Sequence, residues 1–145
     1  MQPDGLFEAT ESLFQALKSW SEALHAERGI STATRGVLEV LWVNGPATVP
    51  MVARERGVSR QHVQQQVDAL LERDLVERRG NPAHKRSLMV ALTDKGRAII
   101  QDMRADEVEA LSRLQVGVSD HATGEAVRVL SAWSEALRRD IASRL

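Results

Sequence analysis

Apolar residues recur every three or four positions along most of the chain, a period that predicts amphipathic helices. Between residues 6 and 26 they fall at spacings of three, four and seven, which indicates a helix with one wide apolar face. Glycine, proline and capping serine or threonine interrupt the pattern where helices are expected to end or begin. The expected helices run, in chain order, from Leu6 to Ala26, from a cap at Ser31 or Thr32 to a break at Asn44, from Val49 to Arg56, from Arg60 to Arg73, from Asp94 toward Val116 and from His121 to Leu145.

A tight turn is expected between the third and fourth of these helices. Gly57 stands where the third helix ends, and Ser59 stands where the fourth requires a cap. Glycine adopts the left-handed conformation that ends a helix at little cost, and a serine hydroxyl accepts a hydrogen bond from a free amide of the first turn. Helix, glycine turn and capped helix together predict a helix-turn-helix.

After Asp74 the hydrophobic period changes to two, which predicts a pair of strands. They are expected at residues 75–79 and 87–92, and Gly80, Asn81 and Pro82 open the loop between them. Lys85 and Arg86 near the end of this loop make the hairpin basic. The chain is therefore predicted to be mainly α, a winged helix-turn-helix with a two-stranded β-wing. Because side chains alternate along a strand, Arg78 and Arg79 before the loop cannot face the same side.

The fourth helix is predicted to read DNA. Its apolar residues Val63, Val67, Leu70 and Leu71 fall on one face, so its polar residues lie away from the core. Arginine pairs with guanine and glutamine with adenine in the major groove, and a recognition helix enters that groove with its N-terminal half. Wing residues are suited to phosphate or minor-groove contacts. The candidate DNA-binding residues are Ser59 (also the cap), Arg60, Gln61, His62, Gln64, Gln65, Lys85 and Arg86.

Charge distribution supports this interpretation better than the net charge of −1 does. Residues 54–86 hold eight Lys or Arg against five Asp or Glu, whereas residues 1–33 and 101–145 each carry an acidic excess. Local fields steer a phosphate backbone because salt screens charges over about 10 Å. The absence of cysteine excludes a disulfide scaffold, a thiolate zinc site and thiol redox sensing. With no signal peptide or apolar run of membrane-spanning length, a cytoplasmic location is expected.

Several short motifs resemble the MarR family of bacterial regulators. They are Gly57-Val58-Ser59-Arg60-Gln61, Val67-Asp68-x-Leu70, Leu75-Val76-Glu77-Arg78, Asn81-Pro82 and Leu92-Thr93-x-Lys95-Gly96, within residues 34–97. The resemblance implies a transcription regulator that binds double-stranded DNA as a homodimer with interlocking terminal helices, on a pseudo-palindromic site. One departure is His84, which replaces the aspartate that often braces the wing arginine; Arg86 matches that arginine.

The resemblance also suggests how the chain is organised. A single domain, residues 1–145, would contain a DNA-binding lobe at 31–94 and dimerisation helices at 1–30 and 95–145. MarR-like proteins commonly hold a small aromatic or phenolic effector between these parts, and Trp20, Trp42 and Trp133 are candidates to line such a cavity. No cofactor is expected. Repression by promoter blocking is expected rather than activation.

Three other functions compete with this interpretation. An enzyme is disfavoured because the four histidines are scattered and no glycine-rich phosphate loop is present. A metal sensor built from histidine and carboxylate ligands would need residues from separate helices to meet. The main alternative is a winged-helix module that binds proteins and has lost DNA readout, which the modest local charge would allow.

Overall fold

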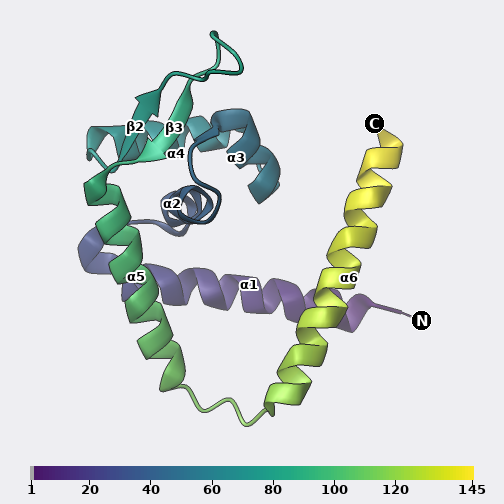
Figure 1. Ribbon diagram of the computed structural model, residues 1–145. Helices are drawn as coiled ribbons and strands as arrows, with labels where there is room; N and C mark the ends of the chain where they lie inside the picture. Colours follow the sequence, from purple (N-terminus) through teal and green to yellow (C-terminus); the bar gives the residue numbers. More distant parts are fainter. Residues whose placement is uncertain (1) are drawn as a thin grey trace. The chain divides into compact units, whose positions relative to one another are not determined.

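The computed structural model describes residues 2–145, which form two compact units divided between Ser112 and Arg113. The first unit contains nine of the elements and the second contains α6 alone. The elements are, in chain order, α1 (Asp4–Leu24), the short 3₁₀ helix η1 (Ala26–Arg28), α2 (Thr32–Asn44), β1 (Ala47–Thr48), α3 (Val49–Arg56), α4 (Arg60–Glu72), β2 (Val76–Arg79), β3 (Met89–Leu92), α5 (Asp94–Ser112) and α6 (Asp120–Arg144). Figure 1 labels the α-helices and the strands β2 and β3.

The predicted helix boundaries rest on cap chemistry that the structure contains. The hydroxyl of Ser31 accepts a hydrogen bond from the amide of Thr34 at 3.2 Å, and that of Ser59 accepts one from the amide of His62 at 3.1 Å. Gly57 ends α3 in the left-handed conformation, with φ of 65°. The helix-turn-helix is thus confirmed, and each of its boundaries has a local chemical cause.

The core of the first unit lies around α2, which packs against α3, α4, α5 and β3. In Figure 1, α2 is seen end-on between these elements, while the β2–β3 hairpin and its loop project from them. The inward face predicted for α4 is confirmed: Val63, Val67 and Leu70 are fully buried, and Leu71 packs half-buried against the same core. Burying this face holds α4 against the body and leaves its opposite face to solvent.

The sheet has three antiparallel strands in the order β1-β3-β2. Strand β1 is only two residues long, too short to give an alternating pattern, and was not predicted from the sequence. In the wing, Val76 pairs with Leu92 and Arg78 pairs with Val90. Val76, Leu92 and Val90 are buried, so Arg78 lies on the inward face of the hairpin.

Several element ends differ from the sequence-based expectation. Helix α5 ends at Ser112 rather than near Val116, and the hydroxyl of Ser112 donates to the carbonyl of Glu109 at 2.6 Å. Such side-chain bonds compete with helix continuation. The first helix ends at Leu24 and is followed by the 3₁₀ turn η1, and strands β2 and β3 begin one and two residues later than expected.

The second unit is a single capped helix. The hydroxyl of Ser119 accepts a hydrogen bond from the amide of Ala122 at 3.1 Å, which sets the start of α6. Large apolar side chains along it, such as Val127, Leu137 and Ile141, are exposed. Within residues 2–145, no helix is both long enough and apolar enough to cross a membrane.

Candidate nucleic-acid interface

The N-terminal half of α4 presents the polar residues that the sequence singled out. Arg60, Gln61, Gln64 and Gln65 are exposed and His62 is half-buried. The cap fixes this first turn, since the Ser59 oxygen accepts from the His62 amide while the hydroxyl hydrogen of Ser59 remains available to a further acceptor. A rigid first turn with outward amides and a guanidinium can present several hydrogen-bonding groups to one surface.

Gln64 has a defined partner on its own helix. Its amide nitrogen donates to Asp68 Oδ1 at 2.8 Å, one turn further along α4. With one N–H engaged, the carbonyl oxygen and the second N–H remain for other partners. The bond holds Gln64 in one orientation, on the side of α4 that faces the wing.

Lys85 and Arg86 lie exposed near the end of the wing loop. The loop is shaped by Asn81: its carbonyl accepts from the His84 amide at 3.2 Å and its side chain from the Ala83 amide at 3.1 Å. His84, the residue expected from the sequence to replace a bracing aspartate, is itself exposed. The turn that leads into Lys85 and Arg86 is therefore held by hydrogen bonds between Asn81 and backbone amides of the loop.

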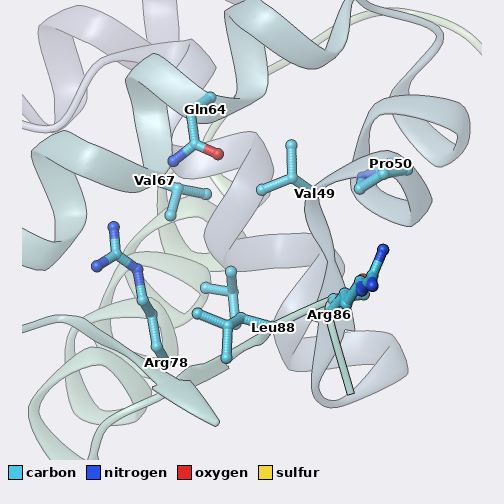
Figure 2. A pocket seen from close by; sticks show the side chains of 9 residues that line it. Val49, Pro50, Gln64, Val67, Arg78, Arg86 and Leu88 are labelled. Carbon is cyan, nitrogen blue, oxygen red and sulfur yellow. The ribbon is translucent and has the colours of Figure 1, made fainter. Parts of the chain in front are cut away.

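Arg78 joins these residues, although it was not among the candidates chosen from the sequence. It lines a cavity of about 370 Å³ between the wing, the start of α3 and α4, together with Gln64 and Arg86. Figure 2 shows the Arg78 side chain extending toward Gln64 and Val67, with Leu88 between Arg78 and Arg86. Alternation along β2 restricts one of Arg78 and Arg79 to the inward face, and the pairing of Arg78 with buried Val90 shows which one.

Arg79 points to the other face of β2 and has a different environment. Its guanidinium donates two hydrogen bonds to Glu77 Oε1, at 2.9 and 2.7 Å, so its charge is neutralised by a neighbour on the same face. Among residues 2–145, no carboxylate pairs with Arg78 in this way. The strand thus separates a neutralised arginine from one whose charge is available at the cavity.

A second cavity, of about 360 Å³, lies within the first unit between α1, α2, α3 and α5. Phe14, Leu17 and Trp20 form an apolar side, and Arg35 and Arg56 contribute guanidinium groups. Burial lowers the pKa of Arg56, whose guanidinium also donates to the Ala33 carbonyl at 3.0 Å. The cavity therefore combines an aromatic wall with charged groups, among them the Glu107 carboxylate that pairs with Arg35.

The other two tryptophans lie elsewhere. Trp42 packs against the core on α2, with the Arg97 guanidinium 5.8 Å from its ring centre. Trp133 is half-buried on α6, in the second unit. Of the three tryptophans proposed from the sequence as ligand-binding residues, Trp20 is the one that lines this second cavity.

Beside the second cavity, Glu107 of α5 connects three elements. It accepts hydrogen bonds from the Arg35 guanidinium, one of them at 2.5 Å, and from Nε2 of the buried His25 at 2.9 Å. Burial alone would raise the pKa of Glu107, but the hydrogen bonds from Arg35 and His25 and the charge of Arg35 outweigh it and lower the pKa below the ordinary 4.5. The Glu107 hydrogen bond and charge raise the pKa of Arg35 in turn, although burial opposes this.

The hydrogen bonds also place the proton of His25. Arg28 can only donate, and its guanidinium lies 3.0 Å from His25 Nδ1, so Nδ1 must accept and the proton must sit on Nε2 toward Glu107. Through these contacts His25, Arg28 and Arg35 hold α5 against the rest of the first unit. Among the residues that the structure describes, no group of three or more His, Asp or Glu is arranged to hold a metal ion.

Comparison with known proteins identifies the family. Residues 28–87 match the sequence profile of the MarR family. Over 125 residues the chain is 33% identical to the uncharacterized protein Rv2011c of Mycobacterium tuberculosis, a match that spans 86% of this chain and 82% of that protein. The same identity and coverage hold for the uncharacterized protein Mb2034c of Mycobacterium bovis.

Solved structures agree over almost the full length. The crystal structure of the MarR family transcription regulator SP03579 superposes with a TM-score of 0.80 at 28% identity, covering 98% of this chain and 95% of that one. NMB1585, a MarR family regulator from Neisseria meningitidis, matches in fold with a TM-score of 0.75 at 18% identity, over 100% and 99% of the two chains. The winged helix-turn-helix, its flanking helices and these matches together place the chain in the MarR family of DNA-binding transcription regulators.

Proposed function

We propose that the protein is a homodimeric, sequence-specific repressor that reads a pseudo-palindromic operator with two copies of α4 and the wing. The observation that supports this most directly is the convergence of the two elements. Gln64 of α4 and Arg78 and Arg86 of the wing line one cavity, so base-reading and phosphate-binding groups share a surface. In this proposal Arg60, Gln61, Gln64 and Gln65, assisted by His62, contact bases in the major groove.

Phosphate contacts complete the proposed interface. Ser59 would donate its free hydroxyl hydrogen to a phosphate oxygen, and Lys85 and Arg86 would anchor the wing on the backbone or in the minor groove. A solved relative by fold, AbfR, was crystallised bound to DNA and superposes with a TM-score of 0.76 at 22% identity, over 95% of this chain and 93% of that one. That likeness supports the fold needed for such a complex.

Homodimer formation is proposed from the terminal helices. On α1, Leu13 and Phe14 are 55% and 58% exposed, and on α6, Val127, Leu137 and Ile141 are also exposed. Apolar stripes of this extent are seldom left in water, and a two-fold partner would cover them. Residues 1–30 and 95–145 would then form the dimerisation layer and residues 31–94 the DNA-binding lobe, with the two recognition helices one DNA turn, ~34 Å, apart.

Release by a small molecule is the further part of the proposal. The cavity beside Trp20 has a volume near the lower end of the range typical of ligand sites, roughly 300–1,000 Å³. Its walls come from α1 and α5 of the proposed dimerisation layer and from α2 and α3 of the lobe. A small aromatic or phenolic ligand held there would change the spacing of the two lobes and so weaken operator binding.

A titration against DNA tests the central proposal. Purified protein is added to a fluorescent duplex from its own upstream region and to a scrambled duplex, at two salt concentrations. Selective binding that weakens with salt, with two-fold symmetric protection of the site, is expected. If both duplexes bind equally weakly and selection from random DNA returns no motif, DNA readout has been lost and the protein-binding alternative stands instead.

A companion measurement tests the dimer separately. Sedimentation equilibrium of the wild type should give twice the mass of one chain. Leu137→Glu, which places a charge on the exposed apolar stripe of α6, should give monomers that retain helical content. A wild type that sediments as a monomer at the concentrations that bind DNA would contradict the dimeric mode of reading.

A further inference from the structure

The C-terminal end of α4 is tied to a part of the chain that lies far away in sequence. Arg73, the residue that follows α4, donates from one guanidinium nitrogen to the carbonyl of Arg28 at 2.8 Å and from the other to the carbonyl of Gly29 at 3.0 Å. These carbonyls lie at the end of η1, where helical partners are missing and a positive group is favoured. A planar guanidinium holds its N–H groups in a fixed fork that matches two neighbouring carbonyls, whereas an ammonium group carries its donors on one nitrogen at the end of a flexible stem.

The Arg28–Gly29 turn is itself fixed to α5. The Arg28 side chain donates to Asp106 Oδ2 at 2.5 Å, and its neighbour His25 bonds to Glu107 on the same helix. Arg28 thus holds α5 through its side chain and the end of α4 through its carbonyl. The start of α5 also contacts the end of α4 directly, because Lys95 Nζ donates to the carbonyl of Arg73 at 3.1 Å.

We propose that Arg73 is a positioning residue for operator binding, which sets the orientation of α4 relative to α1 and α5. This inference rests on the proposed dimeric DNA reading. Arg73 lies at the end of α4 opposite the base-reading residues, so it acts through geometry. A 13-residue helix is about 20 Å long, and a tilt of about 5° at one end would move the other by nearly 2 Å.

A displacement of that size matters most for a dimer. Hydrogen bonds to base edges tolerate only a few tenths of an ångström, and two recognition helices must enter successive turns together. Loss of the clamp should leave α4 folded, because Val63, Val67 and Leu70 stay buried against the core. Loss of the clamp should instead weaken the preference of the dimer for one distance between the two half-sites.

The test measures binding as a function of half-site spacing. Wild type, Arg73→Met and Arg73→Lys are titrated against duplexes that carry the selected half-sites at the preferred spacing and with one or two base pairs inserted or removed. Arg79→Met is the matched control, since it removes one positive charge from the same lobe on the face of β2 away from the cavity. Thermal unfolding and the slope of log K against log salt are recorded for each.

Arg73→Met should lose about tenfold in affinity at the preferred spacing and no more than about threefold at altered spacings, so that its profile is flatter. Its base preference within a half-site and its salt slope should be unchanged. Arg73→Lys, which keeps the charge but lacks the fixed fork of the guanidinium, should lie between the wild type and Arg73→Met, and Arg79→Met should keep the wild-type profile.

Three outcomes would overturn the inference. An unaltered spacing profile in Arg73→Met, or a uniform loss across all spacings, would show that Arg73 does not set the geometry. A salt slope reduced by about one for each protomer would instead identify Arg73 as a phosphate contact. Failure of the proposed function has a different signature, because the wild type itself would then show no preferred half-site, and this inference would fall with it.

Discussion

A Cβ atom on Gly96 would lie 1.8 Å from the carbonyl oxygen of Leu75, far closer than van der Waals contact allows. The first turn of α5 therefore passes directly over the start of the wing. The same carbonyl accepts a hydrogen bond from the Thr93 amide at 3.2 Å, and the Thr93 hydroxyl accepts one from the Gly96 amide at 3.0 Å. Thr93 also donates to the Asp74 carbonyl at 2.7 Å, so the Thr93-x-x-Gly96 motif joins the end of α4, the wing and α5.

Gly96→Ala should destabilise the protein by about 3 kcal/mol or more, because the obstructing atoms are backbone and cannot rotate away. Gly124→Ala is the matched control: it lies within α6, its added methyl group would meet nothing within 4 Å, and the change should be neutral or stabilising by about 0.5–1 kcal/mol. Urea unfolding at one fixed protein concentration measures both. Equal stability of the two variants would contradict the close approach.

The parts of the fold that could be predicted from sequence are those with a local cause. Gly57 and Ser59 define the helix-turn-helix because backbone conformation and capping involve neighbouring residues only. The buried face of α4 follows from periodicity in the same way. Strand β1 escaped prediction because Ala47 and Thr48 gain their strand character only by pairing with Val90 and Met89.

The charged contacts between helices could not be predicted, since their partners are far apart in sequence. His25 and Glu107 are separated by 82 positions, and neither lies in a motif that indicates the other. Arg78 is an intermediate case. Alternation restricted one of two adjacent arginines to the inward face, but choosing it required the register that pairs Arg78 with buried Val90.

The two adjacent arginines of β2 should behave differently in DNA binding. Arg78→Ala should weaken operator binding about tenfold and lower the salt slope by about 0.9 for each protomer, because an unpaired cation at the α4–wing cavity is lost. Arg79→Ala removes the same charge from the face where Glu77 already neutralises it, so its slope should stay near that of the wild type. Fluorescence anisotropy over a salt series compares the two variants with the wild type. A wild-type salt slope in both variants would place neither arginine at phosphate.

Glutamines of α4 should control which bases are read rather than how strongly phosphate is held. Gln61→Ala and Gln65→Ala should each relax the preference at one base pair of the half-site, at a cost of about 1–3 kcal/mol for the preferred base. The salt slope should not change, since no charge is lost. Gln66→Ala is the control, because Gln66 is half-buried on the adjoining side of the helix. A selection experiment that returns the wild-type motif for all three variants would rule out direct readout by these side chains.

Glu107 should make the stability of the protein sensitive to acid. Its pKa in the folded state is lowered below 4.5 by Arg35 and His25, so the unfolded chain binds the proton more tightly than the folded one. The stabilisation is therefore fully present above about pH 4.5 and is lost as the pH falls through the lowered pKa. Glu107→Gln should cost about 2 kcal/mol or more at pH 7, because Arg35 loses the closer of its two carboxylate partners, Glu107 and Glu39.

The difference between wild type and Glu107→Gln identifies the source of this acid sensitivity. It should be largest at neutral pH and should shrink below about pH 4.5, as the wild-type carboxylate becomes protonated. Glu125→Gln is the control, since the ion pair of Glu125 with Arg128 on α6 is solvent-exposed and should contribute no more than about 1 kcal/mol at any pH. Urea unfolding of the three proteins at pH 7, 5 and 3.5 tests this. A gap between wild type and Glu107→Gln that stays constant with pH would mean that the Arg35–Glu107–His25 contacts do not depend on the carboxylate charge.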